Sequence, residues 1–495
     1  HPKKYPENLL ALFMTGFRVL SIMSKHKPGS YGEIFSIALP LVVSTGSWSI
    51  MHFTDRLFLS RWSEDALAAA LPAGVLSFTF VCFFLGTVGY TSTFVAQYFG
   101  AGQEKRIGAV VWQGVWLALI SGIILLPLIP LSGAIFRIIG HPDNIPELET
   151  IYFRIMCHGM IFSLLSNVFS GFFIGLGQTR IVMIVNMFTA GLNIVLDYIM
   201  IFGVAGFPAW GLQGAAWATV ISTIVSAVIF FILYIQKENR QRYNAVSAIG
   251  FQPALMKRVL RFGLPNGVNF FLDISAFSFF VLLVGRLGKV ELTATNIAFN
   301  VNVLAFMPMI GFAVATSTLV GQYIGRGDPE IAVTTVKRVF ILTVSYMTFL
   351  ALSYILMPNI FINLYGTGND PVYLQEIRVV ARGLLIFVAV YCLFDAINMV
   401  YSSAIRGAGD TAFVMRAVAV CSVTVILIPT YLCCVVFHGN IYMAWTFFSA
   451  YIVIMAGVFY WRYRGGKWKS MRVIETPPPE IVPEPGHLAE SEVMR

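Results

Sequence analysis

Four aspartates lie inside long apolar stretches of this sequence, where a carboxylate has little water to stabilise its charge. They are Asp55, Asp197, Asp273 and Asp395, out of nine aspartates in a chain of 495 residues, and none of the glutamates lies as deep. An aspartate at the centre of a hydrocarbon layer costs roughly 2.5 to 3.5 kcal/mol. Each therefore needs a partner, a proton or a function, and we treat all four as candidate functional residues.

Two of these aspartates share a depth with an amide and a hydroxyl. Counting about 1.5 Å per helical residue from the flanking basic residues puts Asp55 and Asp197 in the same outer half of the layer. Asn193 precedes Asp197 by four residues and shares its helix face, and Thr219 reaches a similar depth. Oxygen ligands of this kind suit a small cation or a shared proton. The alternative is structural, since an isolated Asn or Thr in a membrane helix usually joins neighbouring helices.

The other two aspartates form a second acidic centre near the middle of their stretches. Tyr391 lies four residues before Asp395 and shares its face. No lysine or arginine stands obviously near, and burial disfavours a charged carboxyl, so Asp273 and Asp395 could exchange a proton for a cation. For each of the four aspartates the alternative is a helix-end or structural pair, most of all for Asp55 beside Arg56. Asn296 and Asn300, also four residues apart, could line a cavity or equally pack helices together.

The composition shows which elements must position these side chains. The chain is 57% hydrophobic and 12% charged, with a mean hydropathy of +0.77, whereas soluble domains carry about 25% charged residues. This excludes disorder, a coiled coil and an ordinary cytosolic enzyme. Apolar runs of about 20 residues or more predict an all-α polytopic membrane protein, and the alternation of a β-barrel is not visible. We expect twelve spans near residues 33–60, 66–99, 109–138, 150–174, 181–204, 212–235, 259–287, 292–323, 333–357, 377–404, 412–436 and 440–463.

The positive charge predicts how the chain crosses the membrane. With both termini cytoplasmic, eight of the 33 Lys and Arg residues lie outside and the remaining 25 lie inside, as the positive-inside rule requires. This bias also explains the net charge of +9 without a nucleic-acid partner. Leu9–Met23 is short for a span, so we expect an interfacial helix there. The expected organisation is an N-terminal cytoplasmic or interfacial segment (1–32), an N-lobe (33–235), a cytoplasmic connecting loop (236–258), a C-lobe (259–463) and a disordered cytoplasmic tail (464–495).

The two halves of the sequence repeat each other. At an offset of 225 residues, Leu39-Pro40 matches Leu264-Pro265, and Thr91–Gly102 (TSTFVAQYFGAG) matches Thr316–Gly327 (TSTLVGQYIGRG). Each half holds six expected spans, so the repeats enter the membrane in the same direction. Parallel repeats with a cavity between them are typical of secondary transporters. The two prolines each remove a helical hydrogen bond at equivalent positions, where a bend could move the halves.

Enzymatic chemistry has no candidate residues in this sequence. We find no P-loop, HExxH or nucleophile elbow, and therefore expect neither catalysis nor a cofactor. The six cysteines lie in apolar segments without metal-ligand spacing, so we interpret them as small buried hydrophobic residues.

Taken as a set, these patterns resemble the multidrug and toxic compound extrusion (MATE) family, from about residue 31 to 464, and its NorM-like branch in particular. The resemblance rests on Phe53-Thr54-Asp55, Gln97 to Gly102, Leu192 to Tyr198, Gly214 to Thr219, and Tyr391 to Asp395 followed by Arg406-Gly407-x-Gly409. It implies two six-helix lobes in a V shape and alternating access. It also implies a cation or proton site at Asp55, Asn193, Asp197 and Thr219, and a second at Asp273, Tyr391 and Asp395. One departure is Asp273, where NorM-like members usually place Glu.

The resemblance implies export of amphipathic, often cationic compounds against an inward flow of Na⁺ or H⁺. We therefore expect a multidrug efflux antiporter in the cell membrane, a monomer that binds small amphipathic or cationic molecules and no nucleic acid. The alternative is a lipid-linked oligosaccharide flippase of the same superfamily. A flippase should carry a cationic cavity for its pyrophosphate headgroup, whereas the deep charges in this sequence are acidic.

Overall fold

The computed structural model describes residues 26–139, 145–204, 206–364, 371–437 and 439–475. Within these ranges the regular structure is helical and there is no strand. Twelve of the helical segments are long and apolar enough to cross a membrane. The prediction of an all-α, twelve-span membrane protein is therefore confirmed. The expected interfacial helix at Leu9–Met23 lies outside the described residues.

The helices divide into two sets along the chain. The first set comprises α2 (Tyr31–Trp62), α3 (Glu64–Gly89), α4 (Thr91–Gly100), η1 (Glu104–Arg106), α5 (Ile107–Leu125), α6 (Leu128–Ile139), α7 (Ile145–Gly175), α8 (Thr179–Phe202), α9 (Leu212–Tyr234) and α10 (Lys237–Tyr243). The second comprises α11 (Pro253–Val284), α12 (Lys289–Arg326), α13 (Pro329–Leu356), α14 (Pro358–Asn363), α15 (Pro371–Ala408), α16 (Thr411–Cys421), η2 (Ser422–Leu427), α17 (Ile428–Tyr431), η3 (Leu432–Val436), α18 (Ile441–Arg464) and η4 (Lys467–Ser470).

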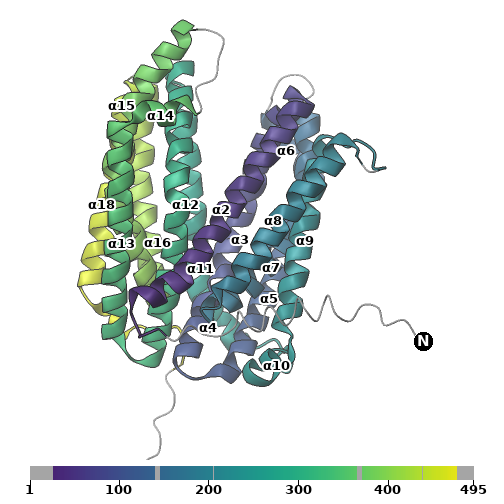
Figure 1. The fold of residues 1–495 in the computed structure, drawn as a ribbon, viewed down its shortest axis with the longest axis vertical. Coiled ribbons are helices and arrows are strands. Elements are labelled where there is room, and N and C mark those ends of the chain that lie inside the picture. Colours follow the sequence, from purple (N-terminus) through teal and green to yellow (C-terminus); the bar gives the residue numbers. More distant parts are fainter. Residues whose placement is uncertain (1–25, 140–144, 205, 365–370, 438, 476–495) are drawn as a thin grey trace, which may run out of the picture.

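Figure 1 shows these sets as two groups of helices, the N-lobe and the C-lobe, which diverge from one end of the molecule toward the other. We call the end where the lobes meet, and where the described chain begins and finishes, the terminal end. The opposite end is the distal end. The arrangement matches the V of two lobes implied by the family resemblance.

The lobes meet at the terminal end through repeat-equivalent residues. Gln97 of α4 donates its amide to the carbonyl of Gly407 at 3.0 Å, and Gln322 of α12 donates to the carbonyl of Gly175 at 2.8 Å. The backbones of α4 and α12 also approach so closely at Gly100 and Gly325 that a Cβ atom on either glycine would collide with the other helix. Only glycine fits at these two positions, because the crossing leaves no room for a side chain.

The first helix of each half begins on the opposite lobe. Ile34, Ile37 and Leu41 of α2 are buried in a C-lobe core, whereas Leu59, farther along the same helix, is buried in the N-lobe. In α11 the order is reversed: Leu255, Met256 and Val259 near its start are buried in the N-lobe core, whereas Phe280, Leu283 and Val284 near its end are buried in a C-lobe core. Pro40 and Pro265 therefore lie where each helix passes between lobes, and neither ends its helix.

Three expected boundaries were wrong. The span expected at 109–138 is two helices, α5 and α6, because Pro127 cannot continue the hydrogen-bond ladder of α5. The connecting loop expected at 236–258 contains α10 and the start of α11, since Pro253 stands at a first-turn position that suits proline. The tail expected to be disordered from residue 464 is packed through Glu475, because Trp468, Val473 and Ile474 bury apolar side chains. Residues 476–495 lie outside the described part.

Candidate functional site

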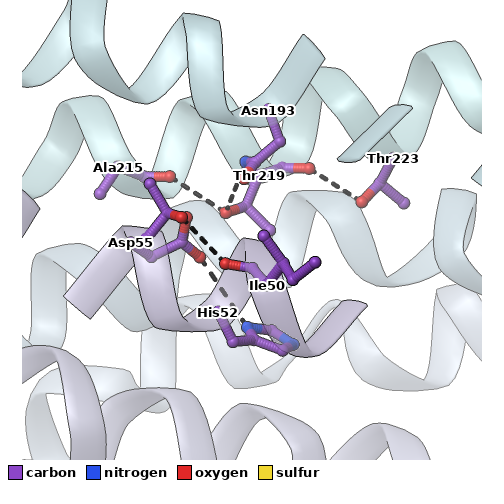
Figure 2. A network of polar contacts seen from close by, with 8 residues as sticks. Ile50, His52, Asp55, Asn193, Ala215, Thr219 and Thr223 are labelled. Carbon is purple, nitrogen blue, oxygen red and sulfur yellow. Dashed lines mark hydrogen bonds and ion pairs between the residues drawn. The ribbon is translucent and has the colours of Figure 1, made fainter. Parts of the chain in front are cut away.

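The first acidic site lies in the N-lobe and joins three helices. Figure 2 shows Asn193 of α8 beside Thr219 of α9 and close to Asp55 of α2, and Asp197 of α8 supplies a second carboxylate within reach of the Asn193 amide. In one orientation the amide nitrogen donates to Thr219 Oγ1 at 3.5 Å. In the other it donates to Asp55 Oδ1 and to Asp197 Oδ2, both at 3.1 Å. The second orientation satisfies more buried oxygen atoms, so the structure brings together all four residues expected at this site.

Burial leaves this site with unused oxygen atoms. Asp197 and Asn193 are fully buried, one helical turn apart on α8, and Asp55 retains 16% side-chain exposure. Within the described structure, Asp197 Oδ1 is buried and has no hydrogen-bond donor. Thr219 donates to the carbonyl of Ala215 at 3.1 Å, so its oxygen can still accept a hydrogen bond or coordinate a cation. An unpartnered carboxylate oxygen beside further hard oxygen atoms is a fitting environment for Na⁺ or H⁺.

Two aromatic residues border the N-lobe site and were not expected from the sequence. His52 Nδ1 lies 3.8 Å from Asp55 Oδ2, and its side chain is 57% exposed (Figure 2). Tyr152 of α7 lies close enough to interact electrostatically with both Asp55 and Asp197. The spacing of His52 and Asp55, three residues apart on one helix, could have indicated their contact. Tyr152 comes from another helix and carried no such signal.

The second acidic site lies in the C-lobe and joins α11 to α15. Asn269 donates to Asp273 Oδ2 at 3.1 Å from one turn earlier on α11. Asp395 of α15 is buried, receives a hydrogen bond from Asn398 and lies within electrostatic range of Asp273. The two aspartates are therefore close enough to influence each other's charge, as the sequence led us to expect.

Asp273 differs from Asp395 in its exposure. Its side chain is exposed, and it continues the face of α11 that touches the N-lobe at Asn266 and Phe270. The carboxylate therefore opens toward the space between the lobes. Asp395 is only 8% exposed, so Asp273 is the more accessible of the two carboxylates.

Aromatic side chains enclose the inner part of the C-lobe site. Tyr391 is 1% exposed and stacks on Trp445 at 6.4 Å, with the ring of Phe448 5.7 Å away. Its hydroxyl is buried without a hydrogen-bond partner among the described residues, and its ring lies within electrostatic range of Asp395. The Tyr391 hydroxyl and Asn269 Oδ1, which is also unpartnered, supply two further oxygen atoms for a cation or a hydronium.

A permanent positive charge lies nearer to this site than we expected. The guanidinium of Arg406 interacts electrostatically with Asp273, and its nearest hydrogen-bond acceptors, the hydroxyls of Ser402 and Ser403, are 3.5 and 3.4 Å away. The sequence separation between Asp395 and Arg406 gives their distance along α15. It does not give the distance of Arg406 from Asp273, which lies on α11. The expectation that no arginine lies near the C-lobe carboxylates was wrong for this reason.

Asn296 and Asn300 occupy an exposed face of α12. Asn300 donates to the carbonyl of Asn296 at 2.8 Å, and both side chains are exposed. The same face reaches the N-lobe farther along, where Thr45 donates to the carbonyl of Met307 at 3.1 Å. The two asparagines therefore continue an interlobe surface toward the distal end rather than join packed helices.

Comparison with known proteins agrees with this architecture. The MatE family model matches residues 40–199 and again residues 265–432, so the two matches begin at the equivalent prolines. The chain belongs to the MatE family.

Relatives within the MatE family cover most of the chain. The "Probable multidrug resistance protein NorM" of Thermotoga maritima is 29% identical over 447 residues, which is 89% of this chain and 94% of the relative. The "Multidrug resistance protein PmpM" of Pseudomonas aeruginosa is 28% identical over 393 residues, 77% of this chain and 80% of the relative. A solved structure titled "Outward-facing conformation of a multidrug resistance MATE family transporter of the MOP superfamily" superposes with a TM-score of 0.81 at 20% identity, covering 94% of this chain and 100% of that one.

MatE membership and twelve apolar helices make this chain a multi-pass membrane protein. For the described residues, no group of three or more His, Cys, Asp or Glu side chains could hold a metal ion. The acidic sites instead combine one or two carboxylates with amide and hydroxyl oxygen atoms, a composition that suits a weakly held monovalent ion in transit.

Proposed function

We propose that this protein is a multidrug efflux antiporter that exports amphipathic, often cationic compounds in exchange for Na⁺ or H⁺ by alternating access. The observation that carries the proposal is the pair of acidic sites, one in each lobe, each of which has at least one buried oxygen atom without a partner among the described residues. The names of the relatives, multidrug resistance proteins NorM and PmpM, support the class of substrate. We further propose that the terminal end faces the cytoplasm.

The C-lobe site offers a physical basis for exchange. A cationic compound between the lobes is attracted by Asp273, whose carboxylate is exposed there. A proton or Na⁺ that binds at Asp273 and Asp395 removes that attraction, because the site then carries less negative charge. The compound and the coupling ion therefore bind competitively, which is the linkage that an antiporter requires.

The N-lobe site offers a second position for the ion. At Asp55 and Asp197 a bound proton or Na⁺ relieves the repulsion between two adjacent carboxylates, which favours one arrangement of α2 against α8. The start of α2 is packed on the C-lobe. A shift of the part of α2 that carries Asp55 therefore changes how the two lobes contact each other. This is a route from ion binding to the relative placement of the lobes.

Transport driven by a single gradient tests the proposal. A Na⁺ gradient and a pH gradient are imposed separately on proteoliposomes that contain the protein. We expect one of the two to drive ethidium transport, and that gradient identifies the coupling ion. Asp395→Asn should reduce this transport by at least about tenfold while the protein stays folded. Full activity of that variant would exclude the proposed exchange mechanism. Silence of the wild-type protein under both gradients would favour the lipid flippase instead.

A further inference from the structure

The last described residues form a strap, Trp468–Glu475, which begins on the C-lobe. Trp468 is 1% exposed, stacks on Tyr463 at 5.0 Å and donates to its carbonyl at 2.9 Å. Lys469 pairs with Glu330 at the start of α13, with a separation of 2.9 Å. The strap is thus continuous with α18 and anchored on the C-lobe.

The other end of the strap is buried in the N-lobe. Val473 and Ile474 are 1% and 6% exposed and belong to the N-lobe core. The amide of Val473 donates to Gln97 Oε1 at 2.8 Å, and this bond is buried. Gln97 is the residue whose amide nitrogen donates to Gly407 on the C-lobe, so one side chain joins α4, the end of α15 and the strap.

Glu475 completes the attachment with its carboxylate. Tyr98 donates its hydroxyl to Glu475 Oε2 at 2.7 Å, and Arg106 pairs with the same oxygen at 3.0 Å. Arg258 of α11 forms an ion pair with the other oxygen. Three groups from α4, η1 and α11 therefore converge on one carboxylate.

The internal repeat gives this carboxylate a counterpart. Tyr323, which matches Tyr98 at the offset of 225, donates its hydroxyl to Glu33 Oε2 at 2.6 Å. Glu33 stands at the start of α2, and the matching position at the start of α11 is Arg258. The second half of the chain thus lacks its own carboxylate at this position and carries a cation there. Glu475 supplies the missing carboxylate to Tyr98 and neutralises Arg258.

We propose that the strap is a conformational lock, in which Glu475 takes the place of the repeat's absent carboxylate and holds the terminal ends of the lobes together. The proposal rests on alternating access, because opening of the terminal end must separate α4 from the end of α15. The strap resists that separation, since it is anchored on the C-lobe and buried in the N-lobe. Substrate entry at the terminal end then requires release of Glu475 and of Val473.

Distances between spin labels on the two lobes test the lock. Labels at Lys105→Cys on the N-lobe and Thr334→Cys on the C-lobe, both at exposed positions, are placed in the full-length chain with its six native cysteines replaced. Glu475→Gln removes the charge but keeps the shape of the side chain. We expect the ratio of separated to closed terminal ends to rise by about tenfold, as loss of a charged hydrogen-bond acceptor predicts. Glu33→Gln should shift the ratio in the same direction.

Lys469→Ala is the matched control. It removes an exposed ion pair within the strap that does not reach the N-lobe, so the distances should stay as in the wild-type protein. A chain that ends at Arg472 removes the buried residues as well and should open further than Glu475→Gln. Wild-type distances in both Glu475→Gln and the shortened chain would overturn the proposal. The distances require no substrate, so failure of the lock and failure of drug export are separate results.

Discussion

At the scale of single residues, the N-lobe site depends on one amide. Asn193→Leu removes the donor that lies 3.1 Å from both Asp55 and Asp197 and leaves two carboxylates without it. We expect loss of ethidium transport and destabilisation by about 1–3 kcal/mol. Asn186→Leu, two turns earlier on α8, is the control, because Asn186 donates to Ser44 and touches neither carboxylate. Thermal unfolding in detergent and proteoliposome transport measure both effects, and equal behaviour of the two variants would contradict the assignment.

Glu475 makes the strap sensitive to acid. Burial alone would raise its pKa, but the hydrogen bond from Tyr98 and the charges of Arg258 and Arg106 outweigh burial and hold the pKa of Glu475 below its usual value. Because the pKa is depressed in the folded state, the stabilisation is fully present above the usual glutamate pKa of about 4.3. It is lost as the pH falls through the lower folded value.

The expected result is constant protection of the Val473 amide between about pH 7 and about pH 5, and loss of protection only below the usual range. Hydrogen exchange, corrected for its intrinsic pH dependence, measures this. In Glu475→Gln the protection should be weaker and independent of pH over the same interval. Loss of wild-type protection already above about pH 5 would contradict the depressed pKa.

Residue spacing along one helix predicted much of both sites. Asn193 with Asp197, and Tyr391 with Asp395, lie four residues apart, and the structure places each pair on one face. The same spacing links Asn269 to Asp273. Tyr152 and Arg406 could not be found in this way, because their proximity to the aspartates depends on how separate helices pack.

At the scale of helices, the crossing of α4 and α12 is the tightest point between the lobes. Gly325→Ala places a methyl group against the backbone of Gln97, so the helices must move apart. We expect destabilisation by about 1–3 kcal/mol, as overpacking predicts, and a larger fraction of separated terminal ends. Gly457→Ala in α18 is the control, because its Cβ would have no neighbour within 4 Å. Thermal unfolding and the spin-label distances measure both, and a neutral Gly325→Ala would show that the crossing is not tight.

Helix number followed from hydropathy, but helix ends did not. A hydropathy run gives the length of an apolar stretch, so the twelve spans were correct in number. A hydropathy run does not show that α5 ends before Pro127, inside an apolar stretch. It also does not show that α11 starts at Pro253, before the next apolar stretch begins. Nor does it reveal that Trp468, Val473 and Ile474 are buried, because one or two apolar residues between polar neighbours do not form a hydropathy run.

At the scale of the whole molecule, the internal repeat predicted two lobes, and the charge distribution predicts their orientation. Since most Lys and Arg residues lie toward the terminal end, we expect both termini in the cytoplasm. Green fluorescent protein fused after Arg495 should therefore fluoresce, whereas alkaline phosphatase at the same position should be inactive. Phosphatase fused after Arg137, in the last turn of α6, should be active. An active phosphatase after Arg495 and an inactive one after Arg137 would show that the termini lie outside the cytoplasm.

The exchange of first helices between the lobes bears on how the protein is made. The N-lobe core contains Leu255, Met256 and Val259 of α11, and also Val473 and Ile474 near the end of the described chain. Domains generally fold as units in the order of their synthesis, but this order cannot hold for the first half. The N-lobe is the first half to leave the ribosome and the last to have its core completed, so it must remain in the membrane with part of its core open until the second half arrives.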